Sequence, residues 1–162
     1  MNLLRPKNLY RHRRQNQWRR HLPVFNMLEK EKVSMVTWNA SGLRDDANRA
    51  TTFAYLRQLG ADIIALQETH TGDTVHSRWT EQWGGPAVWT EHVGLLLRPD
   101  SHIFFASDPV ALLGGRVMAA EVKGGNIPFS SLFLYCVYAP VDAAERVEFI
   151  PGLAKRSILV HT

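Results

Sequence analysis

The stretch ADIIALQETH, residues 61–70, decides how this chain folds. Its apolar run at 63–66 predicts a strand that is buried on both faces, because runs of this length are typical of such strands. The run stops abruptly at an amide, a carboxylate, a hydroxyl and an imidazole, which belong to Gln67, Glu68, Thr69 and His70. Groups of this kind at a strand end indicate a place where a proton or a metal ion could be held.

The residues before this stretch predict a strand, a turn and a helix. Residues 33–38, VSMVTW, are rich in β-branched side chains, and 39–46, NASGLRDD, have the composition of a turn. A helix is expected at 46–59, capped by Asp45 or Asp46, ending before Gly60, and burying a stripe of Ala50, Phe53, Ala54 and Leu56. With a second strand at 62–68, the pattern predicts a βαβ unit.

The rest of the chain predicts mainly strands, at 90–99, 102–108, 115–122 and 131–140, separated by turn residues. A short helix is expected within 71–84, where Val75, Trp79 and Trp83 have helical spacing. Asp142 and Glu145 indicate the start of another helix, which Pro151 is expected to interrupt or end before a strand begins at 157–160.

Basic residues gather at the start of the chain, which has 162 residues and a formal charge of +4. The first 20 residues hold seven Lys or Arg and no acid, whereas residues 21–162 hold 12 basic and 15 acidic residues. We therefore predict a disordered basic tail at 1–31 and one domain at 32–162. The tail could be a nucleic-acid arm, an organellar transit peptide or a solvated extension without a role.

No apolar stretch approaches the ~20 residues that span a bilayer, so no membrane partner is expected. No secretory signal is evident, which predicts an intracellular protein of the nucleus or cytoplasm, or of the mitochondrion if the Arg-rich leader is a transit peptide. The single cysteine, Cys136, excludes an intrachain disulfide and a zinc ribbon. Because it lies in an apolar run, we expect a buried and inert thiol.

Polar residues follow three of the predicted strands: Asn39, Glu68 and Tyr138. If these strands are neighbours, the three side chains share one rim at the carboxyl ends. An amide, a carboxylate and a phenol suit a hard cation and an anionic phosphate. Each also has an ordinary structural explanation, as a turn residue, a solvated carboxylate and a core aromatic, and the residues alone leave both interpretations open.

Four blocks together resemble the endonuclease/exonuclease/phosphatase family: MVTWNASGL (35–43), IIALQETH (63–70), VGLLL (93–97) and LYCVYAP (134–140). In style they are similar to apurinic/apyrimidinic-type endonucleases, especially those of non-LTR retrotransposons. The resemblance covers about residues 33–155. It implies an α/β fold of two packed sheets, a two-sheet α/β sandwich.

The resemblance also implies hydrolysis of DNA phosphodiesters with a divalent metal, usually Mg²⁺, with Mn²⁺ as an alternative. By position, Glu68 would be the principal metal ligand. Asn39 would be a second metal ligand and would orient the phosphate or a metal-bound water. Tyr138 would hydrogen-bond the scissile phosphate. Arg116, Arg44 and His70 are candidates for contacts with the nucleic acid, although a surface ion pair explains Arg116 equally well.

Two later blocks of the family, G-D-x-N and S-D-H, are missing, since the chain reaches SILVHT (157–162) where the first should stand. His161 belongs to a different strand and does not replace the later histidine. We therefore expect an incomplete sandwich with weak or no activity alone, and an exposed sheet edge open to self-association. The alternatives are a non-catalytic remnant, a fragment that binds DNA or RNA through its basic tail, and a phosphoesterase for RNA, lipid or inositol phosphates.

Overall fold

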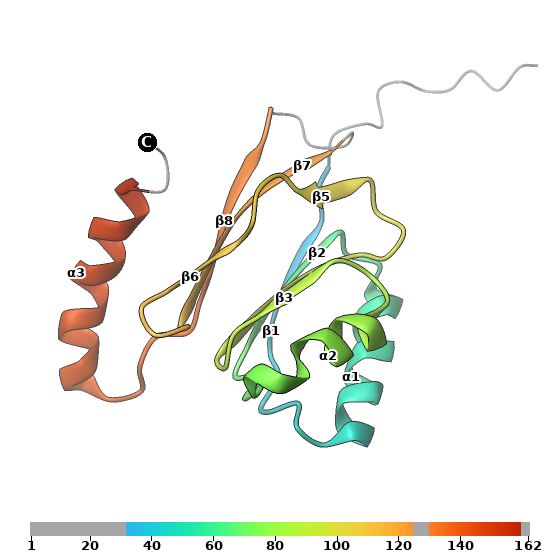
Figure 1. Ribbon diagram of the computed structural model, residues 1–162, viewed down its shortest axis with the longest axis horizontal. Coiled ribbons are helices and arrows are strands. Elements are labelled where there is room, and N and C mark those ends of the chain that lie inside the picture. Colours follow the sequence, from blue (N-terminus) through green and yellow to red (C-terminus); the bar gives the residue numbers. More distant parts are fainter. Residues whose placement is uncertain (1–31, 125–129, 160–162) are drawn as a thin grey trace, which may run out of the picture.

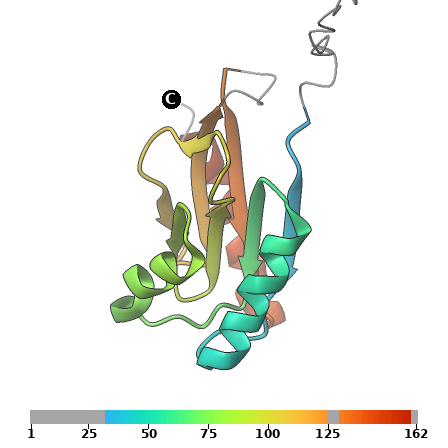
Figure 2. The same cartoon turned by 90° about the vertical axis from the view of Figure 1, so that its right-hand side faces the viewer.

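The computed structural model describes residues 32–124 and 130–159, which form four layers (Figure 1). Helices α1 (Asp46–Leu59) and α2 (His76–Trp83) cover the outer face of the first sheet, and Figure 2 looks onto them. Helix α3 (Ala143–Leu159) stands on the far side of the second sheet. The predicted fold, a two-sheet α/β sandwich, is confirmed.

The first sheet has the strand order β1-β2-β4-β3. Strands β1 (Met35–Asn39) and β2 (Ile63–Gln67) are parallel and are joined through α1, as the βαβ prediction requires. Strand β4 (Val93–Leu97) pairs antiparallel with β2, and β3 (Ala87–Trp89) antiparallel with β4. The register pairs Gln67 with Val93, so β4 begins beside the carboxyl end of β2.

The second sheet is built around β7 (Val117–Gly124) and is antiparallel. Strand β8 (Leu132–Val137) pairs along one edge of β7, while β5 (Ile103–Phe105) and β6 (Val110–Leu112) pair along the other.

Two apolar layers hold the sandwich together. One lies between the sheets and includes Ile63, Leu95 and Val122, all almost fully buried. The other lies between the first sheet and its helices and is rich in aromatic rings: Phe53, Trp79, Trp83 and Trp89. Strand β2 contributes side chains to both layers, which is why its sequence reads as a continuous apolar run.

Helix α1 begins and ends as predicted but buries a different stripe. Asp45 accepts a hydrogen bond from the Asn48 amide at 2.7 Å, and Gly60 ends the helix in the left-handed conformation, at φ 65°. Phe53 and Leu56 are buried, whereas the expected Ala50 and Ala54 are exposed.

Arg49 takes the place of these alanines in the buried stripe, with an exposure of 1%. Its guanidinium donates to the Gln82 side chain at 2.7 Å and to the Leu43 carbonyl at 2.8 Å, and it lies over the Trp79 ring. A buried charge is tolerated here because its donors are bonded, so Arg49 fastens α2 to α1.

Three expectations about the strands and the last helix were wrong. Strands β3 and β6 were not expected, because three residues are too few to show an alternating pattern. The strand expected at 157–160 is not formed, since α3 continues to Leu159. Pro151 lies inside that helix and does not end it. One proline removes a single helical hydrogen bond, and the good helix formers Leu153, Ala154 and Lys155 follow it.

Within the described part of the chain, β1 is one edge of the first sheet and pairs only with β2, while β8 is one edge of the second sheet and pairs only with β7. The opposite edges are β3 in the first sheet and β5 with β6 in the second. A groove of about 540 Å³ lies between β1 and β8, lined from both sheets by residues that include Met35, Thr37, Gln67, Leu132 and Cys136. Neither β1 nor β8 contains a charged residue or a proline, the usual protection of an open edge.

Among the described residues, no helix combines the length and the apolar character needed to cross a membrane.

Gly94, in the VGLLL block, leaves room for an aromatic ring. A Cβ atom at this position would lie 2.6 Å from two carbon atoms of the Trp89 ring. We expect Gly94→Ala to lower the free energy of unfolding by about 1–3 kcal/mol, because the overpacked ring must shift. Urea denaturation measures this, with Gly72→Ala as the control.

A Cβ atom on Gly72 would have no atom within 4 Å beyond the residue itself and its two chain neighbours, and the φ of Gly72 is −106°. The control should therefore stay within about 0.5 kcal/mol of the parent chain. Equal stability of the Gly94→Ala and Gly72→Ala variants would contradict the packing argument.

Candidate active site

The ends of β1 and β2 stay paired beyond the strands themselves. The amide of Ala40 donates to the Gln67 carbonyl at 2.8 Å, and the amide of Gly42 donates to the Glu68 carbonyl at 2.7 Å. The amide of Leu43 then donates to the Thr69 carbonyl at 3.0 Å. These bonds hold the turn after β1 against the turn after β2, so the side chains of both turns occupy one rim.

Asn39 and Glu68 meet directly on this rim. The Asn39 amide nitrogen donates to Glu68 Oε1 at 2.9 Å, while its carbonyl oxygen accepts from the Ser41 amide at 2.9 Å. The second bond is the local turn interaction typical of asparagine, and it fixes which end of the amide faces the carboxylate. The Asn39 amide therefore orients the Glu68 carboxylate through Oε1, and the second carboxylate oxygen, Oε2, takes no part in this bond.

The backbone of the rim adopts conformations that are unfavourable for ordinary residues. Four non-glycine residues have positive φ in the described part of the chain, and three of them lie here: Ser41 (49°), Glu68 (53°) and His70 (53°). Such conformations cost of order 1 kcal/mol each and gather at functional sites. The cost at Glu68 is offset by the bond from Gly42 to its carbonyl.

Tyr138 reaches the same rim from the second sheet. Its amide donates to the Arg116 carbonyl at 2.8 Å, directly after β8 ends. Burial raises the pKa of the Tyr138 phenol, and the charge of Glu68 and a hydrogen bond with that carboxylate raise it further. Asn39, Glu68 and Tyr138 therefore come together as expected, although β8 is not in the same sheet as β1 and β2.

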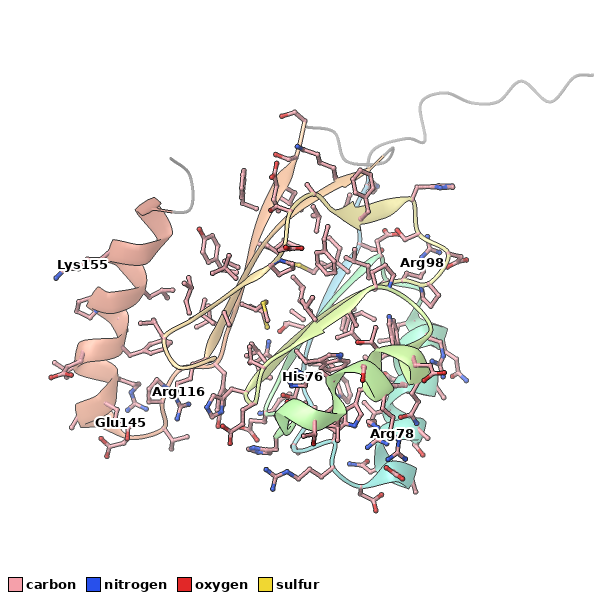
Figure 3. All side chains as sticks on the ribbon, in the orientation of Figure 1. His76, Arg78, Arg98, Arg116, Glu145 and Lys155 are labelled. Carbon is pink, nitrogen blue, oxygen red and sulfur yellow. The ribbon has the colours of Figure 1, made fainter. Side chains whose placement is uncertain are left out.

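Figure 3 labels Arg116, which precedes β7 and packs against Tyr138. Its guanidinium carbon is 5.5 Å from the centre of the Tyr138 ring, and its charge partly opposes the rise in the pKa of that phenol. Among the described residues no carboxylate forms a salt bridge with Arg116, so the surface ion pair considered from the sequence is not formed there.

The other two candidates for nucleic-acid contacts lie together on the same turn. The exposed Arg44 side chain donates through Nε to the His70 carbonyl at 2.6 Å. His70 packs close to the turn after β1, where a Cβ atom on Gly42 would lie 3.4 Å from His70 Cδ2. With Arg116, these residues place positive or titratable groups around Glu68.

His92 also belongs to this rim and was missed from the sequence. Its ring centre is 6.0 Å from that of Tyr138, and burial, followed by the charge of Arg116, lowers its pKa. The antiparallel register of β2 and β4 brings His92 opposite the end of β2. Only the pairing of β2 with β4 would have revealed that His92 belongs to the rim, and this pairing cannot be predicted until the strand order is known.

The donors on the rim fit a hard divalent cation, with one carboxylate at Glu68 and one amide at Asn39. Magnesium binds one or two carboxylates and keeps several water molecules, so this donor set is sufficient to begin a site. Within residues 32–124 and 130–159, no group of three or more His, Cys, Asp or Glu residues is arranged to hold a metal. The described chain therefore contributes few of the ligands, and water would supply most of the others.

Cys136 has no part in this arrangement. Its thiol is 3% exposed, and burial raises its pKa to about 11. The thiol donates to the Leu66 carbonyl at 3.4 Å. The prediction of a buried, inert cysteine is confirmed.

The model of the Endonuclease/Exonuclease/phosphatase family matches residues 36–141. The chain belongs to this family. The matched segment contains the four blocks that carry the resemblance, except for Met35 at the start of the first, together with every candidate site residue.

Two curated proteins are similar in sequence. Over 127 residues the chain is 28% identical to the Transposon TX1 uncharacterized 149 kDa protein of Xenopus laevis, covering 75% of this chain and 10% of that protein. Over 122 residues it is 24% identical to the Exodeoxyribonuclease of Bacillus subtilis, covering 72% and 47%.

Solved structures share the fold at low sequence identity. Humanized D. rerio TDP2 matches with a TM-score of 0.57 and 18% identity, over 78% of this chain and 58% of that one. ANGEL2, described as a 2′,3′-cyclic phosphatase, matches with a TM-score of 0.51 and 12% identity, over 71% and 43%. The chain thus spans about half the length of the exodeoxyribonuclease and of these family structures, and a tenth of the transposon protein.

The contact between Glu68 and Tyr138 should be visible in the titration of the phenol. We expect Glu68→Gln to lower the pKa of Tyr138, because it removes a negative charge that disfavours the phenolate. We expect Arg116→Gln to raise it, because it removes a cation that favours the phenolate. NMR of chains labelled at the tyrosine ring carbons measures both shifts, with Tyr55 as an internal reference. Shifts of the same sign in the two variants would contradict this geometry.

Proposed function

We propose that this chain provides the part of a divalent-metal-dependent phosphodiesterase site that contains the main metal ligand, with DNA as the substrate. Glu68 is the proposed principal ligand of Mg²⁺ or Mn²⁺, with Asn39 beside it. Tyr138 is the proposed hydrogen-bond donor to the scissile phosphate. Membership of the family supports phosphoester chemistry in general.

The observation that carries the proposal is the convergence of Asn39, Glu68 and Tyr138 on one rim from two sheets. A bound metal would polarise a phosphoryl oxygen and neutralise developing charge. The raised pKa of Tyr138 keeps the phenol protonated, so its hydroxyl can donate to a phosphate oxygen. Arg116, which has no acidic partner in the described chain, is proposed to contact the nucleic-acid backbone, together with Arg44 and His70.

The relatives favour DNA over the other substrates of the family. One is named an exodeoxyribonuclease and the other a transposon protein, and each match covers more than two thirds of this chain. The similarity to ANGEL2 concerns the fold at 12% identity, which gives weaker support to the alternative of a phosphoesterase for RNA, lipid or inositol phosphates.

We further propose that the chain alone is weakly active or inactive. Residues 32–162 are proposed to be the N-terminal part of the domain, because the chain spans about half of the relatives of domain size. Among the described residues, the rim brings one carboxylate, that of Glu68, to the proposed metal position.

We expect no Mg²⁺-dependent nicking of supercoiled plasmid DNA above the level of the Glu68→Gln variant. We nevertheless expect Mn²⁺ to broaden the NMR signals of residues 39 and 68, because the ligand pair is already assembled, and Glu68→Gln to remove this broadening. Asp100→Asn, which changes an exposed carboxylate elsewhere, is the matched control.

Nicking by the parent chain that Glu68→Gln abolishes would show that the chain is active by itself. Equal broadening in the parent chain and in Glu68→Gln would overturn the metal assignment. Turnover of RNA, lipid or inositol phosphates without DNA nicking would favour the alternative substrates.

A second candidate function is nucleic-acid binding through the basic residues 1–31, which lie outside the described residues. The first 20 of these residues hold seven Lys or Arg and no acid, which favours contact with phosphates. Removal of residues 1–31 separates the two functions. DNA binding that is lost with this segment and insensitive to Glu68→Gln would indicate a binding module.

The edge strand β1, which pairs only with β2 among the described residues, is proposed to associate with a second copy of the chain. We expect a sedimentation coefficient that rises with protein concentration, because uncharged edge strands pair readily. Met35→Lys should reduce this rise, since Met35 is 58% exposed on β1. Leu59→Lys, at an exposed position on α1, should leave it unchanged. A parent chain that stays monomeric over the same range would contradict the proposal.

A further inference from the structure

Two side chains from different segments hold the ring of Tyr138. The imidazole of His92 comes from the turn before β4, and its centre is 6.0 Å from the phenol centre, with an angle of 33° between the rings. The guanidinium carbon of Arg116, from the turn before β7, is 5.5 Å from the same ring centre. Both side chains contact the aromatic ring of Tyr138, so together they restrict the position of that ring.

These contacts are kept at a cost in hydrogen bonding. His92 Nδ1 and Arg116 Nη1 are buried without a partner, and they are two of the three such side-chain atoms in the described chain. A buried unpaired group destabilises the fold, and native proteins contain few of them. Two such atoms on residues that pack against one phenol indicate that the ring contact is maintained for a reason other than stability.

Hydrogen bonds connect the turn that contains His92 to the segments of Glu68 and Arg116, the two neighbours of Tyr138 on the rim. The His92 carbonyl accepts from the amide of Thr69, the residue after Glu68, at 3.3 Å. The hydroxyl of Thr90 accepts from the His92 amide at 3.3 Å and donates to the carbonyl of Gly115 at 2.5 Å. The turn at 90–92 therefore fixes the distance between the end of β2, with its carboxylate, and the loop that carries Arg116.

The charges around His92 allow it to pack as a neutral ring. Burial and the positive charge of Arg116 lower its pKa, the charge of His70 acts in the same direction, and Glu91 opposes them. A neutral imidazole can lie against the phenol without adding a second cation beside Arg116.

We propose that His92 is a positioning residue that, together with Arg116, holds the ring of Tyr138 so that its hydroxyl faces Glu68. The purpose of this arrangement rests on the proposed function, because a fixed phenol is useful for donating to a phosphate. The geometry itself can be tested in a chain that has no nuclease activity.

The test is the position of the Tyr138 ring, read by NMR from nuclear Overhauser effects (NOEs) between its labelled ring protons and neighbouring side chains. In the parent chain the ring should show NOEs to the side chains of Glu68 and Arg116. In a His92→Ala chain these NOEs should be lost, because the released ring no longer keeps one orientation. His92→Phe keeps a ring in place and should retain them.

A merely structural role for His92 would lower the melting temperature and leave the NOEs of the Tyr138 ring intact. Equal NOE intensities in the parent and His92→Ala chains would therefore overturn the proposal, as would loss of these NOEs in His92→Phe. Tyr55 and the amide spectrum report whether each variant is folded. Lack of plasmid nicking bears on the proposed function and leaves this result unaffected.

Discussion

The site depends on the main-chain pairing of β1 with β2, which continues past the ends of both strands. The bond from the Gly42 amide to the Glu68 carbonyl, at 2.7 Å, holds Glu68 while its backbone adopts a positive φ. That conformation turns the carboxylate out of the strand direction and toward the Asn39 amide. Local strain at one residue is stabilised here by pairing between segments about 25 residues apart, and the polar rim exists only while the two strands stay in register.

Local sequence was enough to predict the elements that depend on local physics. The β-branched run before Asn39, the cap at Asp45 and the glycine at 60 each act within a few residues, and the structure has the expected strand, cap and helix end. The four blocks in order predicted the family and the two-sheet fold, and the rim contains all three expected residues. Pro151 was misjudged because a helix can lose one bond and continue when the following residues favour helix.

What the sequence did not predict depends on distant partners. Arg49 looks like a surface residue of a helix, and local partners at Asp46 and Leu43 satisfy part of its guanidinium, but its burial also requires the distant Gln82 side chain and the Trp79 ring. His92 reaches the rim only because β4 runs antiparallel to β2. Tyr138 arrives from the second sheet, so its position depends on how two sheets pack, which no spacing along the chain encodes. In each case burial or function is decided by residues dozens of positions away.

The strands that bring polar groups to the rim also have open edges. Asn39 ends β1, Tyr138 follows β8, and each of these strands lacks a partner on one side within the described chain. Glu68, by contrast, follows β2, which is paired on both sides. Glu68, the proposed metal ligand, is therefore firmly held, while Asn39 and Tyr138 lie at the ends of edge strands. Pairing at either edge would order Asn39 or Tyr138 relative to Glu68, so the stability of the fold and the geometry of the site depend on the same two surfaces.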